Sequence, residues 1–119
     1  LTRGGASDPA AIMSMVSWAR TNYNVDSSRI YAVGVSSGAM MTQVLLAQYP
    51  DVFAAGTSLW VTGYLFRYGK LDELVEQSMR KRPSNENRQQ WGDAARAMYP
   101  DYSGRYPRIQ IWHGTNDTT

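Results

Sequence analysis

The apolar residues recur along the chain at a spacing that predicts several helices. Between Asp8-Pro9 and Asn22 they fall three and four positions apart, as on one side of an amphipathic helix over 9–22. Asp8 is the expected N-cap of this helix, with Pro9 as its first residue. Similar spacing predicts helices over 71–81 and 87–98, and residues 39–49 are expected to form another helix, which Pro50 stops.

Short apolar runs between the helices predict strands. Residues 29–33 are apolar and partly β-branched and end at Gly34, as expected for a buried strand of a parallel sheet. Residues 53–59 and 108–112 predict two more strands, whereas 63–69 fits neither pattern. Strands that alternate with helices are typical of a parallel sheet with helices on its faces. The sequence therefore predicts an α/β fold.

The two ends of the chain suggest that this sheet belongs to a larger domain. The chain has 119 residues, begins at Leu1 and stops at Thr119, shortly after an apolar run. Three strands form a thin sheet whose outer edges would be left unpaired. We therefore expect residues 1–119 to be an internal fragment of a single domain, with strands missing before Leu1 and a segment missing after Thr119.

Composition and charge exclude several classes of function. The chain is 43% hydrophobic and 18% charged, which is typical of a globular domain. The net charge of +2 is too small to predict nucleic-acid binding, and no apolar stretch approaches the roughly 18 residues of a membrane span. With no cysteine and one histidine, neither a thiolate nor a histidine metal site is expected. We expect no metal, no other cofactor, no nucleic acid and no membrane partner.

The most informative motif is G-x-S-x-G, formed by Gly34-Val35-Ser36-Ser37-Gly38 between a predicted strand and a predicted helix. In a nucleophile elbow, this turn strains the backbone of the central serine and lifts its hydroxyl above the sheet edge. We expect glycine at 34 and 38 because a Cβ at either position would clash across the turn. The N–H of Ser37, at the start of the helix, is the expected oxyanion donor.

The alternative is a glycine-rich turn that only packs tightly or binds a phosphate. Phosphate-binding loops require the spacings G-x-x-x-x-G-K-[ST] or G-x-G-x-x-G, and neither occurs in this sequence. Ser37 is the rival serine, but it lies away from the centre of the motif. We therefore predict that Ser36 is a nucleophile.

A serine nucleophile needs a base and a carboxylate, which follow it in the order acid, then histidine. Asp117, which follows the predicted strand 108–112, is the expected acid, and an Asx turn or loop cap is its alternative role. His113 precedes that acid, so we expect it to brace the loop through hydrogen bonds rather than act as the base. The catalytic histidine is expected beyond Thr119, and a second oxyanion donor upstream of Leu1.

With these residues in place, the sequence resembles carbohydrate esterase family 1, the fungal acetylxylan and feruloyl esterases related to polyhydroxybutyrate depolymerases. The most specific run is Ser-Ser-Gly-Ala-Met-Met-Thr at 36–42. The resemblance implies a partial α/β-hydrolase fold, secretion, no metal, and a Ser–His–Asp triad that removes acetyl or feruloyl groups from plant xylan. Ser36 and Asp117 match its nucleophile and acid. The other similar runs are 29–31, 49–56, 91–92, 98–100, 102–104 and 109–115.

From the motif and the resemblance together, we expect a secreted, monomeric serine carboxylic ester hydrolase. The activity expected first is that of an acetylxylan esterase working through an acyl-enzyme, with acetylated or feruloylated plant cell-wall polysaccharide as its partner. The alternatives are a feruloyl esterase or polyhydroxybutyrate depolymerase, a peptidase or thioesterase of the same fold, and a non-catalytic binding protein on the same scaffold. Residues 1–119 alone are expected to be inactive.

One stretch departs from the family pattern and leaves the substrate-binding residues open. Over 59–88, the loop Trp60-Val61-Thr62-Gly63-Tyr64 and a charged segment replace a small-residue loop that contains cysteine. That loop borders the acyl pocket in the family. Trp60 and Tyr64 therefore either line the site or belong to the core, since aromatic residues after a strand are often buried.

Overall fold

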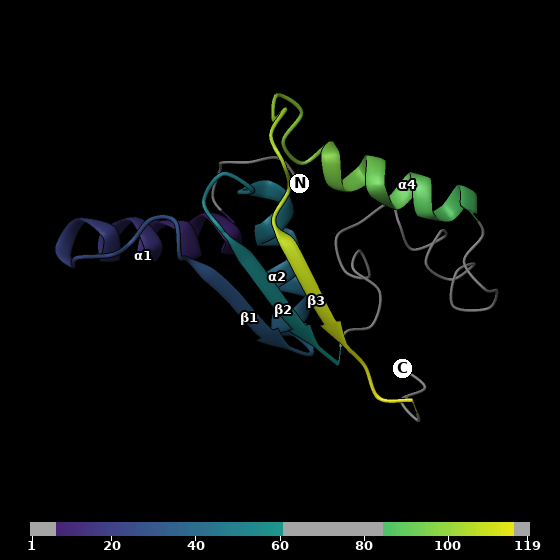
Figure 1. Ribbon diagram of the computed structural model, residues 1–119, viewed down its shortest axis with the longest axis horizontal. Helices are drawn as coiled ribbons and strands as arrows, with labels where there is room; N and C mark the ends of the chain where they lie inside the picture. Colours follow the sequence, from purple (N-terminus) through teal and green to yellow (C-terminus); the bar gives the residue numbers. More distant parts are fainter. Residues whose placement is uncertain (1–6, 61–84, 116–119) are drawn as a thin grey trace.

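The computed structural model describes residues 7–60 and 85–115, in which helices and strands alternate along the chain (Figure 1). In chain order the elements are α1 (Asp8–Asn22), β1 (Tyr31–Val35), α2 (Ser37–Gln48), β2 (Ala55–Leu59), α4 (Asn85–Arg96) and β3 (Arg108–Trp112). The three strands form a parallel sheet in the order β1-β2-β3. The predicted α/β fold is confirmed.

The register brings the carboxyl ends of the three strands to one edge of the sheet. Val35 is paired with Leu59, and Leu59 with Trp112, at the last position of each strand. In sheets of this type, ligands bind at the edge where the strands end. We therefore expect functional groups in the segments that follow Val35, Leu59 and Trp112.

The start of the first helix differs slightly from its predicted form. α1 begins at Asp8, and its N-cap is Ser7 rather than Asp8. The reason is that the carbonyl of Ser7 already accepts a helical hydrogen bond, at 3.0 Å, from the N–H of Ala11. Pro9 lies in the first turn, where its missing N–H costs nothing.

The first strand lies two residues later than predicted. The N–H of Arg29 donates to the carbonyl of Asp26 at 3.0 Å, so Arg29 belongs to a turn rather than to the strand. At the other end, Gly34 is still paired with Ser58. Gly34 therefore belongs to β1 and does not terminate it.

The other predicted elements are confirmed, with small shifts at their ends. α2 starts two residues before the predicted 39, β2 starts two after 53, and α4 ends before 98. The strand predicted over 108–112 has those bounds. The helix predicted over 71–81, and the stretch 63–69, lie outside the described residues. Within the described residues, no helix combines the length and apolar character that a membrane span needs.

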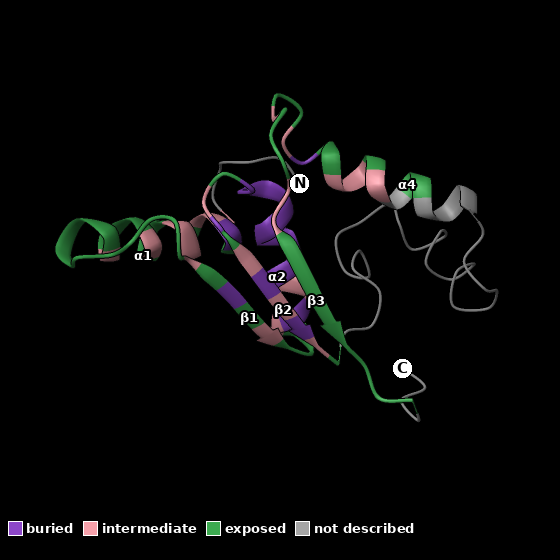
Figure 2. Ribbon diagram, viewed as in Figure 1, coloured by how far each residue is buried: buried purple, intermediate pink, exposed green. Residues whose placement is uncertain are grey.

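The core lies between the sheet and α2, which covers one face of β1 and β2 (Figures 1 and 2). Every residue from Thr42 to Gln48 is buried, as expected for a helix enclosed by its neighbours. α1 and α4 pack against the same side as α2, through Ile12 and Met13 from α1 and through Ala94 and Ala95 from α4. The buried core residues are Ala32, Leu45, Leu46, Tyr49 and Phe53, with Ala47 and Met98 in a second cluster.

The opposite face of the sheet is not covered by any described element. Tyr31, Val33 and Val35 of β1 are exposed, as is Trp112 of β3. Figure 1 looks onto this face, with α2 behind the strands. The predicted burial of the first strand is therefore confirmed at Ala32, on the α2 side, and wrong for the opposite face within the described residues, because the described helices all lie on the α2 side.

Candidate active site

Ser36 is the single residue between β1 and α2, and its backbone is strained. β1 ends at Val35 and α2 begins at Ser37, which leaves Ser36 with φ 54° and ψ −118°. Residues other than glycine rarely adopt such a conformation, which costs about 1–3 kcal/mol and is concentrated at functional sites. The side chain is exposed at the sheet edge. The strand and the helix predicted on either side of the G-x-S-x-G motif are both present.

Hydrogen bonds from two elements hold this strained backbone. The N–H of Ser36 donates to the carbonyl of Leu59 in β2 at 3.0 Å. The carbonyl of Ser36 accepts from the N–H groups of Ala39 and Met40 in α2, at 3.0 and 3.2 Å. The position of Ser36 is therefore fixed by both the sheet and the helix.

The two glycines of the motif are not equivalent. A Cβ added to Gly34 would collide with the carbonyl of Gly38 and would lie 2.7 Å from the nitrogen of Ala39. A Cβ added to Gly38 would meet nothing within 4 Å. The predicted clash is thus confirmed at Gly34, where the backbone of Gly38 fills the space that a Cβ would occupy. For Gly38 the prediction is wrong, because no atom lies close to its Cβ position.

The start of α2 presents backbone N–H groups close to Ser36. The first helical hydrogen bonds are donated by Ala39 and Met40, so the N–H groups of Ser37 and Gly38 precede them. The helix dipole makes this end of α2 electropositive, which suits a developing oxyanion. The role of Ser37 as an oxyanion donor stays a prediction.

A buried serine ties this end of the helix to the sheet. Ser58 of β2 is fully buried, and its hydroxyl donates to the carbonyl of Ala39 at 3.1 Å. Ala39 lies in the first turn of α2. The bond therefore fixes the turn behind Ser36 against β2. Sequence patterns gave no signal for this role, because a buried serine and an exposed serine in a strand look the same in the sequence.

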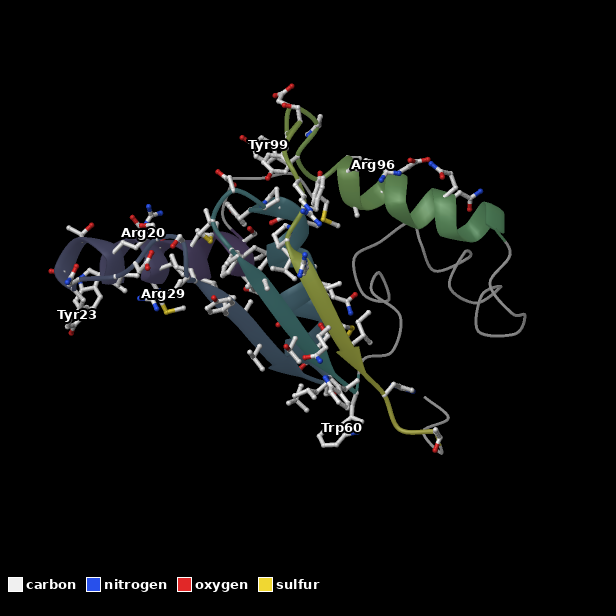
Figure 3. The ribbon with its side chains drawn as sticks, viewed as in Figure 1. Arg20, Tyr23, Arg29, Trp60, Arg96 and Tyr99 are labelled. Atoms are coloured by element: carbon white, nitrogen blue, oxygen red, sulfur yellow. The ribbon has the colours of Figure 1, made fainter. Side chains whose placement is uncertain are left out.

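Trp60, directly after β2, has the second strained conformation in the described residues. Its φ is 51°, and its N–H donates to the carbonyl of Trp112 in β3 at 2.8 Å. Its side chain is 59% exposed and lies beyond the ends of the strands (Figure 3). Within the described residues, Trp60 is therefore not part of the buried core. Tyr64 lies outside the described residues.

The predicted acid cannot be placed, but the strand before it is present. Asp117 lies outside the described residues, so its role as the acid stays a prediction. β3 ends at Trp112, at the same sheet edge as Ser36. His113 is the next residue and is exposed. Its expected part in bracing the loop also stays a prediction.

A cavity of about 230 Å³ lies elsewhere, between α2, α4 and β3. Leu46, Ala95 and Ile109 are among its mainly apolar lining residues. Tyr106 also lines it, and the buried hydroxyl of Tyr106 has no hydrogen-bond partner. The cavity is on the α2 side of the sheet, and Ser36 is not among its lining residues.

A parallel sheet with a serine on a strained strand-to-helix turn is the defining arrangement of the α/β-hydrolases. The described residues thus form part of an α/β-hydrolase fold. The sequence model of the Prolyl oligopeptidase family matches residues 3–119, and the chain belongs to that family.

Individual relatives are similar over nearly the whole chain. Feruloyl esterase B of Talaromyces funiculosus is 42% identical over 120 residues, which cover 98% of this chain and 34% of the relative. Acetylxylan esterase of Coprinopsis cinerea is 41% identical over 117 residues, which cover 98% of this chain and 31% of the relative. The solved structure of an acetyl xylan esterase from Aspergillus awamori matches with a TM-score of 0.82 and 36% identity.

These comparisons confirm the resemblance to fungal acetylxylan and feruloyl esterases. They also give the extent of the match. The chain spans about a third of the length of the curated relatives and 44% of the solved chain, although 99% of this chain is aligned with the latter.

Proposed function

We propose that the chain is the internal part of the catalytic domain of a serine ester hydrolase that deacetylates plant xylan. The observation that carries the proposal is Ser36, an exposed hydroxyl on a strained turn at the carboxyl edge of a parallel sheet. The relatives named acetylxylan esterase and feruloyl esterase B support the substrate class. In this proposal the second oxyanion donor and the histidine come from sequence before Leu1 and after Thr119.

The proposed reaction proceeds through an acyl-enzyme. The hydroxyl oxygen of Ser36 attacks the ester carbonyl carbon while its proton passes to the histidine, which Asp117 orients. The N–H of Ser37 stabilises the tetrahedral oxyanion. The bond to the sugar oxygen then breaks, and the sugar leaves with the proton held by the histidine. Water attacks the acyl group on Ser36, releases acetate and restores the hydroxyl.

The test of this mechanism is acetate release from acetylated xylan by the full-length protein. Ser36→Ala should lower kcat on the order of 10⁴-fold or more, since it removes the nucleophile. Ser37→Ala is the matched control and should retain most activity, because Ser37 acts through its backbone N–H. Turnover that survives Ser36→Ala would show that another residue is the nucleophile.

The same assay tests the acid and the base. Asp117→Asn should slow acetate release strongly, because the histidine would lose the carboxylate that orients it. His113→Ala should leave most of the activity, since the base is placed beyond Thr119. A loss with His113→Ala as large as that with Ser36→Ala would reverse this assignment.

A peptidase is the second candidate, because the family whose sequence model matches is named for an oligopeptidase. Fold alone does not fix the acyl donor. Parallel assays with acetylated xylan, a feruloyl ester and a proline-containing peptide separate the candidates through their kcat/KM values. A higher value for the peptide would favour the peptidase. A full-length protein with no histidine after Asp117, and no turnover of any substrate, would indicate a non-catalytic binding protein.

The proposal also includes secretion and a monomeric state, since the substrate is a polysaccharide outside the cell. Secretion is checked by detecting the full-length protein in the culture medium of its source. Sedimentation of the purified full-length protein measures the oligomeric state, and a stable dimer would contradict the second part.

A further inference from the structure

Ser36 and Trp60 are neighbours at the edge of the sheet. Val35 and Leu59 are the last paired residues of β1 and β2, and Ser36 and Trp60 each lie one position further along. Adjacent strands are about 4.8 Å apart, so the backbones of these two residues lie side by side. Both have positive φ, 54° and 51°. Two strained residues that follow different strands thus lie side by side.

The conformation of Trp60 determines where its indole lies. Along β2, the buried residues Gly56 and Ser58 alternate with less buried ones, and Ser58 contacts α2. A side chain at 60 that continued this alternation would point toward α2 and be covered. The positive φ breaks the alternation, and the indole is 59% exposed beyond the strand ends (Figure 3). The bond from its N–H to Trp112 anchors this arrangement to β3.

We propose that the indole of Trp60 is a binding platform for a ring of the ester substrate, beside the proposed nucleophile Ser36. The proposal deepens the ester hydrolase function and relies on it for the reacting group. An indole offers a wide apolar face that packs against an aromatic ring or against the C–H groups on one side of a sugar ring. Acetylated xylan carries a sugar ring on the alcohol side of the ester, and a feruloyl ester carries an aromatic ring on the acyl side.

The kinetic test compares ring-bearing and ringless esters in the full-length protein. Trp60→Gly removes the indole while keeping the turn, because glycine adopts positive φ without strain. For acetylated xylotriose or methyl ferulate, KM should rise roughly tenfold with little change in kcat, as for the loss of a stacked aromatic contact. Vinyl acetate, which has no ring, should be hydrolysed as before. The substrate that responds shows which side of the ester the platform binds.

Two further variants separate stacking from a structural role. Trp60→Phe keeps a smaller flat ring and should restore part of the lost affinity. Trp18→Ala removes an equally exposed tryptophan, at 58%, from α1, and should change none of the constants. An equal fall for vinyl acetate and the ring-bearing esters would overturn the platform in favour of a structural role. No change with any substrate would also overturn it.

A binding measurement makes the inference independent of ester hydrolysis. Calorimetry on the Ser36→Ala protein measures the Kd for xylotriose and for ferulamide, neither of which carries an ester. Adding Trp60→Gly should weaken one of them roughly tenfold. If the wild-type protein hydrolyses no ester, the proposed function fails, and this measurement alone decides the role of Trp60. Equal Kd values with and without the indole would reject the platform.

Discussion

At residue scale, the elbow depends on which atoms come close to one another across the turn. Gly34 faces the carbonyl of Gly38, and a side chain at 34 has no room. Gly38 contributes its backbone to that contact, while its own Cβ position is open. Two glycines that look symmetrical in the motif therefore have different reasons to be present.

This asymmetry predicts opposite results for the two alanine variants. Gly34→Ala should lower the free energy of unfolding by about 3 kcal/mol or more, because the obstructing atoms are backbone and cannot rotate away. Gly38→Ala should leave the free energy of unfolding unchanged or raise it by up to about 1 kcal/mol, since alanine is the better helix former. Urea denaturation of the full-length variants measures both values. Similar losses for the two variants would contradict the asymmetry.

The sequence placed Ser36 between a strand and a helix, as the structure does, but could not reveal the conformation of Trp60. The position of Ser36 in the turn was predictable because G-x-S-x-G has a fixed spacing between a strand and a helix. A positive φ at a tryptophan carries no such signal, since bulky side chains normally avoid it. The role of Ser58 was hidden for a different reason: its partner, Ala39, lies in another element. Contacts between elements depend on the packed fold and cannot be read from local pattern.

At element scale, the connection between α1 and β1 is a turn organised by one carboxylate. Asp26 accepts hydrogen bonds from the N–H and the hydroxyl of Ser28, at 2.9 and 2.6 Å, and from Arg29 at 2.7 Å. These donors, with the Ser28 hydroxyl first, lower the pKa of Asp26 below its ordinary value of 3.8. The carboxylate thus sets where the chain leaves the turn to begin β1.

The lowered pKa gives this turn a defined pH dependence. Because the pKa is lower in the folded state, the bonds stabilise the turn above the unfolded pKa, and this contribution is lost as pH falls through the folded value. Ser28→Ala should raise the pKa of Asp26 toward 3.8, as measured by NMR titration of the carboxyl carbon. Ser27→Ala is the matched control, since Ser27 is not among the groups that shift this pKa. An unchanged pKa in Ser28→Ala would refute the assignment.

Element types were predicted more reliably than element ends. All six described helices and strands were predicted, and β3 has its predicted bounds. The ends of β1 and α2 shifted because they are set by the turn at Asp26 and by the strained residue Ser36. Side-chain hydrogen bonds and backbone strain decide such ends, and apolar periodicity carries no information about either.

At the scale of the whole molecule, one face of the sheet presents apolar side chains to solvent. Tyr31, Val33, Val35 and Trp112 are all exposed on it, and the described helices lie on the other side. The expectation that the first strand is buried came from its apolar residues, which favour a position between other elements. The composition of a strand does not show which element covers it.

This face predicts the behaviour of residues 1–119 when they are purified alone. They should bind an apolar fluorescent dye and self-associate, because contiguous exposed apolar surface of this kind promotes association. They should also release no acetate from acetylated xylan above background. The full-length protein, in the same dye assay, is the control and should bind much less. A monomeric, dye-free fragment would show that the face is shielded.

The hydrogen bonds that join the residues at the strand ends also affect how the candidate site forms during folding. Ser36 is tied to Leu59, and Trp60 to Trp112, so the edge is assembled from three segments far apart along the chain. Contacts of such high sequence separation are slow to form during folding. Under the proposed function, catalytic competence should therefore emerge late, after the strands have aligned and after the histidine segment that follows β3 has docked.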